Sequence, residues 1–260
     1  MIENWVIDIL EENCQRYNQF DFIVNDPISI PHQYILNQDV EIAGFFTAIL
    51  SWGQRKTILN NAEKLMQLFG NAPYDFMLNH SEKDLIALQH FKHRTFNYTD
   101  LLYFISFFKD YYQKNDSLEN AFYAEDEFGC CSVEKGLVQF HELFFSLPDF
   151  PTRTKKHIST PLKKSTCKRL NMFLRWMVRA DENQVDFGIW KRIPMSELYI
   201  PFDVHVERFA RKLQLIKREK KDWETVKELT NNLKLIDPND PIRFDYALFG
   251  MGIAEKNNYF

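Results

Sequence analysis

The chain has 260 residues, of which 45% are hydrophobic, 26% charged and 15% aromatic, and its formal net charge is −4. This composition is that of a globular protein long enough to bury a core. The negative total argues mildly against nucleic acid as a partner, unless basic residues gather locally. Only 8 glycines are present, fewer than the turns of a large β-sandwich or a nucleotide-binding α/β fold normally need, which favours helices.

The N-terminus carries acids among its apolar residues and has no basic region, unlike a secretory signal, and no apolar run reaches the roughly 18 residues that a membrane span requires. The four cysteines lack the C-x-x-C spacing of metal sites, and the histidines lack H-x-x-x-H spacing. Reduced thiols in a cytosol are the simplest interpretation. We therefore expect a cytoplasmic protein without a metal, a cofactor or a membrane partner.

Helical spacing of apolar residues recurs along most of the chain, so we expect an all-α protein. The predicted helices cover residues 2–17, 40–52, 58–69, a short stretch from 73, 101–112, a short stretch after 117, 133–146, 168–179, 203–216, 223–236 and 242–251. The expected N-caps are Asn97 or Thr99, Ser117, Ser165 or Thr166, and Asp222. Residues 23–30 are the most strand-like segment, and two long connections, 149–164 and 181–201, separate the later helices.

The connection that ends at residue 168 is strongly basic. Seven basic side chains and no acid lie between residues 153 and 169: Arg153, Lys155, Lys156, Lys163, Lys164, Lys168 and Arg169. Lysine charge beside the free N–H groups of a helix start, with Ser165 and Thr166 among them, is suited to holding a phosphate. The alternative interpretation is a solvated basic loop.

Asp203 stands at the start of a predicted helix, directly after Pro201 and between the apolar residues Phe202 and Val204. An acid in this position can accept backbone N–H groups as an N-cap. It can equally act as a general base or as an electrostatic stabiliser. The segment taken alone leaves both interpretations open.

Four segments in chain order resemble the helix-hairpin-helix DNA glycosylase superfamily, which includes endonuclease III and 8-oxoguanine glycosylases. Residues 203–213 are similar to the V-D-x-H-V helix that begins with the family's catalytic aspartate. Residues 168–174 are similar to the K-T-A-x-x-x-L helix, whose lysine is the nucleophile of bifunctional members. Residues 41–51 resemble an early helix that ends in L-L-S, and residues 244–250 resemble the late H-x-x-L-x-x-x-G helix.

The chain departs from this family in three ways. Residues 161–168 stand where the L-P-G-V-G-x-K hairpin is expected, and they lack its glycines. The separation of Lys168 and Asp203 is 203 − 168 = 35 residues, longer than in endonuclease III and closer to divergent archaeal 8-oxoguanine glycosylases. No cysteine follows Cys167, so the resemblance is to a divergent member without the iron–sulfur cluster.

The resemblance implies one two-lobed helical unit over residues 1–260, with an active-site cleft between its lobes. One lobe would comprise about residues 40–147, and the hairpin-bearing lobe residues 1–39 and 148–260. The implied protein is a monomeric, nucleoid-associated glycosylase of base-excision repair that acts on duplex DNA at a damaged base such as an oxidised purine. Lys168 would attack the sugar and permit AP-lyase activity, and Asp203 would stabilise the developing positive charge.

The resemblance also implies residues that contact DNA. These are Lys163, Lys164, Ser165, Thr166 and Arg169 around the hairpin, with Gln54 and Arg55 at the vacated position of the base stack. Three alternatives stay open: Lys168 binds phosphate only, the protein binds DNA without catalysis on the same scaffold, or Asp203 and His205 act on a small substrate. The glycine-poor hairpin and the negative net charge favour the second of these.

Overall fold

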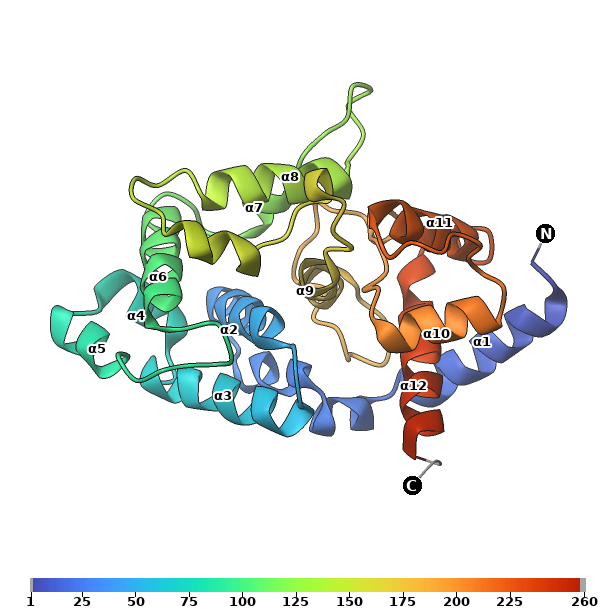
Figure 1. The fold of residues 1–260 in the computed structure, drawn as a ribbon, viewed down its shortest axis with the longest axis horizontal. Helices are drawn as coiled ribbons and strands as arrows, with labels where there is room; N and C mark the ends of the chain where they lie inside the picture. The colour runs from blue at the N-terminus through green and yellow to red at the C-terminus, as the bar shows by residue number, and fades with distance from the viewer. Residues whose placement is uncertain (1, 258–260) are drawn as a thin grey trace.

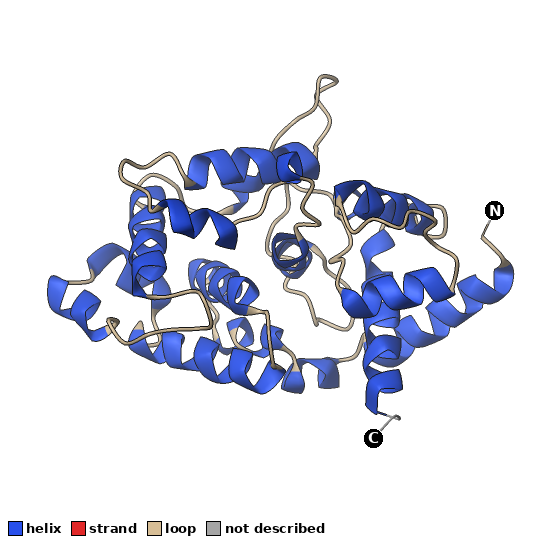
Figure 2. Cartoon of the chain, in the orientation of Figure 1, coloured by secondary structure: helices blue, strands red, loops and turns tan. Residues whose placement is uncertain are grey.

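A computed structural model of the chain describes residues 2–257. All regular elements within this range are helices, as Figure 2 shows. The α-helices are α1 (Asn4–Tyr17), α2 (Asn37–Leu50), α3 (Arg55–Leu68), α4 (Pro73–Asn79), α5 (Glu82–Ala87), α6 (Tyr98–Tyr112), α7 (Glu119–Phe122), α8 (Val133–Phe144), α9 (Lys168–Val178), α10 (Val204–Lys212), α11 (Trp223–Lys234) and α12 (Phe244–Asn257). Seven 3-10 helices join them: η1 (Phe20–Asn25), η2 (Pro27–Ser29), η3 (Pro31–Gln33), η4 (Thr152–His157), η5 (Pro161–Lys163), η6 (Met195–Glu197) and η7 (Pro241–Arg243). The prediction of an all-α protein is confirmed.

Residues 23–30, the most strand-like segment of the sequence, are not a strand. This stretch forms the end of η1 and the whole of η2. Pro27 has no N–H for a strand ladder, and it begins η2 instead. The carboxylate of Asp26 caps η2 by accepting the backbone N–H of Ile28 at 3.1 Å. The local cap and the proline therefore outweigh the apolar residues around them.

Two of the predicted N-caps are confirmed. Asn97 caps α6 by accepting the N–H of Asp100, whose side chain reaches back to form a capping box. Asp222 caps α11 by accepting the N–H of Thr225. Caps of this kind satisfy the backbone donors that the first turn of a helix leaves unpaired.

Two other N-caps were predicted wrongly. The cap of α9 is Cys167, in a left-handed conformation, and not Ser165 or Thr166. The cap of α7 is Leu118, although the Oγ of Ser117 does accept the N–H of Glu119 at 3.1 Å. The helix α5, which the sequence analysis did not predict, is a short turn and buries none of its residues.

Helix α9 lies between two groups of helices in Figure 1, with α2 to α8 on one side and α1, α10, α11 and α12 on the other. It packs against α2, whereas α12 packs against both α1 and α10. The ring of Phe45 on α2 lies 5.3 Å from that of Phe173 on α9 and 5.2 Å from that of Phe108 on α6. This aromatic core uses many of the 24 phenylalanines and fixes where α9 begins.

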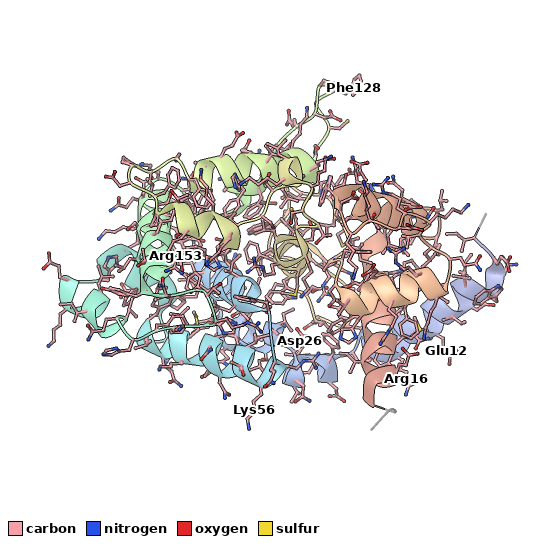
Figure 3. The ribbon with its side chains drawn as sticks, in the orientation of Figure 1. Glu12, Arg16, Asp26, Lys56, Phe128 and Arg153 are labelled. Atoms are coloured by element: carbon pink, nitrogen blue, oxygen red, sulfur yellow. The ribbon has the colours of Figure 1, made fainter. Side chains whose placement is uncertain are left out.

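Helix α2 is deeply buried, since every residue from 40 to 50 is buried. Neither it nor any other helix in the described range is long and apolar enough to cross a lipid bilayer. At the opposite extreme, Phe128 is 81% exposed at the tip of a segment that protrudes from the molecule (Figure 3).

Candidate functional site

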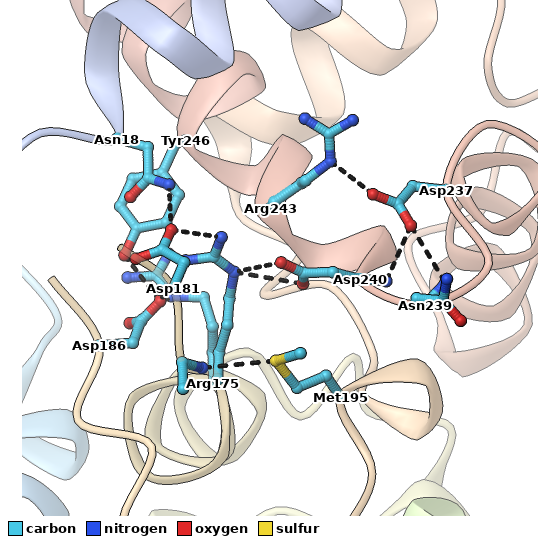
Figure 4. A network of polar contacts seen from close by, with 12 residues as sticks. Asn18, Arg175, Asp181, Asp186, Met195, Asp237, Asn239, Asp240, Arg243 and Tyr246 are labelled. Atoms are coloured by element: carbon cyan, nitrogen blue, oxygen red, sulfur yellow. Dashed lines mark hydrogen bonds and ion pairs between the residues drawn. The ribbon is translucent and has the colours of Figure 1, made fainter. Parts of the chain in front are cut away.

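Two arginines on the interior face of α9 organise a buried polar network, shown in Figure 4. Arg175 donates from Nε to Asp186 at 3.2 Å, and Arg179 donates to the other oxygen of Asp186 at 3.1 Å. The hydroxyl of Tyr246 donates to the same carboxylate at 2.8 Å. Arg179 also pairs with Asp240 at 2.9 Å. Buried charges persist only when they are paired in this way, so the network holds α9 and α12 in register.

The connection at residues 181–201 supplies part of this network and is otherwise bound along α9. The N–H of Phe187 donates to Trp176 O at 2.8 Å, and that of Trp190 donates to Met177 O at 2.9 Å. The indole of Trp190 donates in turn to Glu41 on α2 at 2.6 Å. The long separation between Lys168 and Asp203 is therefore occupied by a structural segment that fastens α9 to its neighbours.

Lys168 is the first residue of α9 and is half-buried. Its Nζ donates to the Sδ of Met172 at 3.4 Å, and sulfur is a weak acceptor. Among the described residues, no carboxylate oxygen lies within the 4.0 Å that would define an ion pair with this amine. The amine is thus held in place without being neutralised by direct contact.

Asp203 is the N-cap of α10. Its Oδ1 accepts the backbone N–H groups of His205 at 2.8 Å and Val206 at 3.0 Å. The residue is half-buried. Both capping bonds use one oxygen, which leaves Oδ2 for a further partner while the carboxylate stays fixed at the start of the helix.

Asp245, in the first turn of α12, is only 5% exposed. Its Oδ2 accepts a hydrogen bond from Arg175, whereas its Oδ1 is buried and has no partner in the described part of the chain. The pKa of Asp245 is raised to about 7, mainly by burial. The positive charges of Arg175 and Lys168 lower this pKa, and the negative charge of Asp203 raises it. Asp245 is therefore close enough to both predicted catalytic residues to be affected by their charges.

Asp26 belongs to the same neighbourhood and lies near the middle of the view in Figure 3. Burial raises its pKa, while Arg175, Arg55 and Lys168 lower it. We call Lys168, Arg175, Asp26, Asp203 and Asp245 the Lys168 cluster. Burial opposes the charge of Arg175, but the carboxylates around it, Asp186 first among them, raise its pKa above the ordinary value. A permanently cationic arginine thus lies among the acids of the cluster.

The predicted residues of the turn after α2 are exposed. Gln54 is the N-cap of α3, and Arg55 is its first residue. The guanidinium of Arg55 lies 5.8 Å from the centre of the Phe249 ring on α12. Arg55 therefore extends from the start of α3 towards the helix that carries Asp245.

The predicted phosphate-binding residues form the turn before α9. Lys163 and Lys164 are exposed, whereas Ser165 and Thr166 are half-buried. Lys164 and Cys167 both have left-handed backbones, with φ of 58° and 50°. Such conformations favour glycine, so this turn has the backbone of a glycine-containing loop although it has none.

Arg169 has a different environment from the other basic residues of this region. Its guanidinium donates to Ile49 O at 2.7 Å and to His157 O at 3.2 Å. It thereby satisfies a carbonyl near the C-terminal end of α2, and burial lowers its pKa to about 10. These bonds give Arg169 a structural role in joining α2 to α9.

His205 packs beneath α12. Its ring centre lies 5.7 Å from that of Phe249, and its Nδ1 is buried without a partner in the described range. A Cβ added at Gly252 would lie 2.5 Å from the Cβ of His205. It is the backbone N–H of His205, not the ring, that bonds to Asp203.

The sequence analysis did not assign a role to Asp26, Arg175 or Asp245. Each is a single charge inside an otherwise apolar run, in FIVNDPI, MFLRWMV and FDYALF respectively. A charge at such a position is buried when its neighbours are, and it then needs a partner. A single charge within an apolar run therefore predicts a buried charged residue, but it does not identify the residue that pairs with it.

One cavity of about 640 Å³ lies apart from the Lys168 cluster, beside Leu36, Glu41 and Trp190. Its buried acid, Glu41, already accepts hydrogen bonds from Tyr112, Ser117, Leu118 and Trp190. Because these bonds satisfy the carboxylate, we assign Glu41 to the scaffold and not to the chemistry.

The described chain is thus an all-helical protein in which a buried arginine of α9, Arg175, pairs with Asp186 and Asp245. It belongs to the family described as "Protein of unknown function (DUF2400)", whose family model matches residues 26–254. The match begins at Asp26 and includes the whole Lys168 cluster. Neither a curated protein nor a solved structure matches the chain.

Proposed function

We propose that this protein is a DNA glycosylase of the helix-hairpin-helix type that removes a damaged base, such as an oxidised purine, from duplex DNA. The observation that carries the proposal is that Lys168 and Asp203, 35 residues apart (203 − 168) in the sequence, are both half-buried at a helix start, with no ion pair to either in the described range. Each begins its own helix, α9 or α10, and both charges act on the same buried carboxyl group. This is the pair that the resemblance requires.

The proposal assigns the helices to two lobes. Helices α2 to α8 would form one lobe, and α1 with α9 to α12 would form the hairpin-bearing lobe (Figure 1). The Lys168 cluster draws residues from both sides of α9, since Asp26 precedes α2 and Asp245 lies on α12. DNA would enter between the lobes and present one nucleotide to the cluster.

The turn at residues 161–167 supports a role as a hairpin that holds phosphate. In the family motif the first glycine stands four residues before the lysine, and Lys164 has that position here with a φ of 58°. Lys164 therefore holds a left-handed backbone that glycine would adopt more easily, at a strain cost of about 1 kcal/mol. Lys163 and Lys164 add exposed charge where a phosphate would approach the start of α9.

The proposed reaction assigns one role to each member of the pair. The neutral amine of Lys168 attacks C1′ of the extruded nucleotide while the damaged base departs. The carboxylate of Asp203 stabilises the positive charge that develops on the sugar. A Schiff base to Lys168 follows and permits strand cleavage by β-elimination. Gln54 and Arg55 would occupy the space that the extruded nucleotide leaves in the stack.

Borohydride trapping tests this proposal. The purified protein is incubated with duplex oligonucleotides that carry 8-oxoguanine, uracil, thymine glycol or an abasic site, and borohydride reduces any Schiff base to a stable adduct. We expect an adduct with wild-type protein and with Lys83→Ala, an exposed lysine of α5, but none with Lys168→Ala. Absence of both adduct and base release on every duplex, with DNA binding intact, would contradict the proposal and support binding without catalysis.

A further inference from the structure

We propose that Arg94 binds a backbone phosphate of the DNA duplex while its guanidinium group is stacked on the ring of Trp52. This inference rests on the proposed function, because it needs a duplex across the face where α9 begins. It adds a contact from the α2 to α8 lobe, in which the sequence analysis selected only Gln54 and Arg55. An arginine recognises a phosphate by its charge and by its planar set of donors.

Three stretches of the sequence that contain no acidic residue meet near the C-terminal end of α2. They are residues 42–62, 85–99 and 150–180. Nε2 of His93 bonds to Trp52 O at 3.2 Å, which joins the first stretch to the second. Arg153 donates to Thr95 O at 2.8 Å, which joins the second stretch to the third. A chain with a net charge of −4 thus gathers basic segments in one region, and binding to phosphates requires such a local basic surface.

The basic side chains of the first two stretches are all exposed. They are Arg55, Lys56, Lys92 and Arg94. Asp100, the acid that follows the second stretch, is buried and forms an ion pair with Arg153 at 3.3 Å. Arg153 and Arg169 instead hold the protein together, because Arg153 pairs with this acid and Arg169 donates to two backbone carbonyls. Arg94 therefore differs from these two arginines in having its charge available to a ligand.

Arg94 is held in one place, although its side chain forms no hydrogen bond or ion pair among the described residues. The Cζ of its guanidinium lies 4.5 Å from the centre of the Trp52 ring. Gly53 leaves the space for this contact, since a Cβ at Gly53 would lie 2.7 Å from Nη1 of Arg94. An arginine stacked on a ring keeps the N–H groups at the edge of its plane available, and two of them can bind one phosphate together.

The ring beneath Arg94 is itself fixed by its neighbours. The ring of His93 meets that of Trp52 edge-on, with the ring centres 5.9 Å apart. Nδ1 of His93 bonds to Nδ2 of Asn61 at 2.8 Å, which fastens this arrangement to α3. The backbone of Arg94 is left-handed, with a φ of 55°, and residues held in such conformations are frequent at ligand sites. A guanidinium that is positioned before the ligand arrives loses less entropy when it binds.

Arg94 lies at the same end of α2 as the start of α9. Arg169, the second residue of α9, donates to Ile49 O at 2.7 Å, close to the C-terminal end of α2. Trp52 follows the last residue of α2 after one intervening residue. A duplex that presents one nucleotide to Lys168 would therefore also pass the end of α2, where Arg94 can reach its backbone.

The experiment measures the affinity for a fluorescein-labelled duplex that carries a tetrahydrofuran analogue of an abasic site, by fluorescence anisotropy. The measurement is repeated at several salt concentrations and with each of the four bases opposite the analogue. Wild-type protein is compared with Arg94→Ala and Arg94→Lys. The matched control is Arg192→Ala, because Arg192 is also exposed and its Cζ lies 3.9 Å from the centre of the Tyr123 ring, far along the chain from Trp52. Circular dichroism checks that each variant is folded.

We expect Arg94→Ala to weaken binding by roughly 10-fold, and by the same factor for every opposite base, as for loss of one charged contact to a phosphate. The slope of log affinity against log salt should become less steep by about 1. Arg94→Lys should restore the slope because it keeps the charge, but only part of the affinity because an ammonium lacks the planar pair of donors. Arg192→Ala should bind as wild type does. If Arg94→Ala does not fold, Arg94→Gln retains a long side chain without its charge and should change the slope equally.

Three results would overturn the inference. An unchanged salt slope in folded Arg94→Ala, or an equal change in Arg192→Ala, would remove Arg94 from the phosphate contacts while leaving the glycosylase proposal intact. A loss of affinity that depends on the opposite base, with an unchanged slope, would assign Arg94 to base recognition. A wild-type protein that does not bind the duplex would overturn this inference and the proposed function together. Duplex binding without a borohydride adduct would overturn only the proposed function, since the salt slope would still decide the role of Arg94.

Discussion

Replacing Asp245 by asparagine should change how the stability of this protein depends on pH, whatever its activity. Burial raises the pKa of Asp245 from 3.8 to about 7. Between these values the folded protein holds a proton that the unfolded chain releases, so the free energy of unfolding falls as pH rises. The whole shift corresponds to roughly 4 kcal/mol, since one pKa unit is about 1.4 kcal/mol.

Somewhat more than half of this total is lost between pH 5 and pH 8, with most of the loss below pH 7. Asp245→Asn has no proton to release, so it lacks this part of the slope. Its absolute stability also changes, because Arg175 keeps Asp186 but loses one carboxylate partner. The prediction therefore concerns the difference in slope between the two proteins and not their stability at any single pH.

Urea unfolding at pH 5, 6, 7 and 8, followed by circular dichroism, measures the effect. With an m-value of about 2.5 kcal/mol per molar urea, the wild-type midpoint should fall by about 1 M relative to that of Asp245→Asn across this range. The control is Asp110→Asn, because Asp110 forms only an exposed ion pair with Lys114 and its variant should follow the wild-type slope. Parallel slopes for wild type and Asp245→Asn would refute the reasoning from burial.

Three further predictions concern the backbone, a helix cap and the charged turn. Gly136→Ala should destabilise the protein by at least about 3 kcal/mol in thermal unfolding, because the new Cβ would lie 1.9 Å from a backbone oxygen. Gly70→Ala is the control: the new Cβ would have no atom within 4 Å, and with a φ of +67° this change should cost only about 1 kcal/mol. Equal effects of the two changes would contradict the argument from packing. Asp203→Ala should lower the free energy of unfolding by about 1 kcal/mol, because it removes the cap of α10. Asp203→Asn should keep that stability and still abolish rapid adduct formation. If Asp203→Asn forms the adduct as fast as wild type, Asp203 acts only as a helix cap. Replacing Lys163 and Lys164 together by alanine should weaken duplex binding and lower the slope of log affinity against log salt by about 2, as fluorescence anisotropy would measure, and an unchanged slope would remove this turn from the DNA interface.

Local signals in the sequence determined much of the secondary structure. Apolar spacing identified most of the helices, and Asn97 and Asp222 were recognised as caps because their hydrogen bonds are made within one turn. Local signals also failed in particular places. At η2, Pro27 and the cap at Asp26 outweighed an apolar run, and α9 begins at a left-handed Cys167 although Ser165 and Thr166 were available.

The Lys168 cluster is a different matter, because its members meet only in the tertiary structure. The sequence selected Lys168 and Asp203 through a resemblance, but it gave no reason to connect either with Asp26 or Asp245, which lie far away along the chain. That connection depends on the packing of α9 against α2, on the bond from Arg175 of α9 to Asp245 of α12, and on the aromatic core around Phe45. Burial then changes the chemistry of Asp245, which would be an ordinary anion in the unfolded chain. In the folded protein it lies beside Arg175 with no partner for Oδ1 in the described range, and its pKa is raised to about 7. Residue types and local order are written in the sequence, whereas desolvation and the charges of distant residues arise only when the chain has folded.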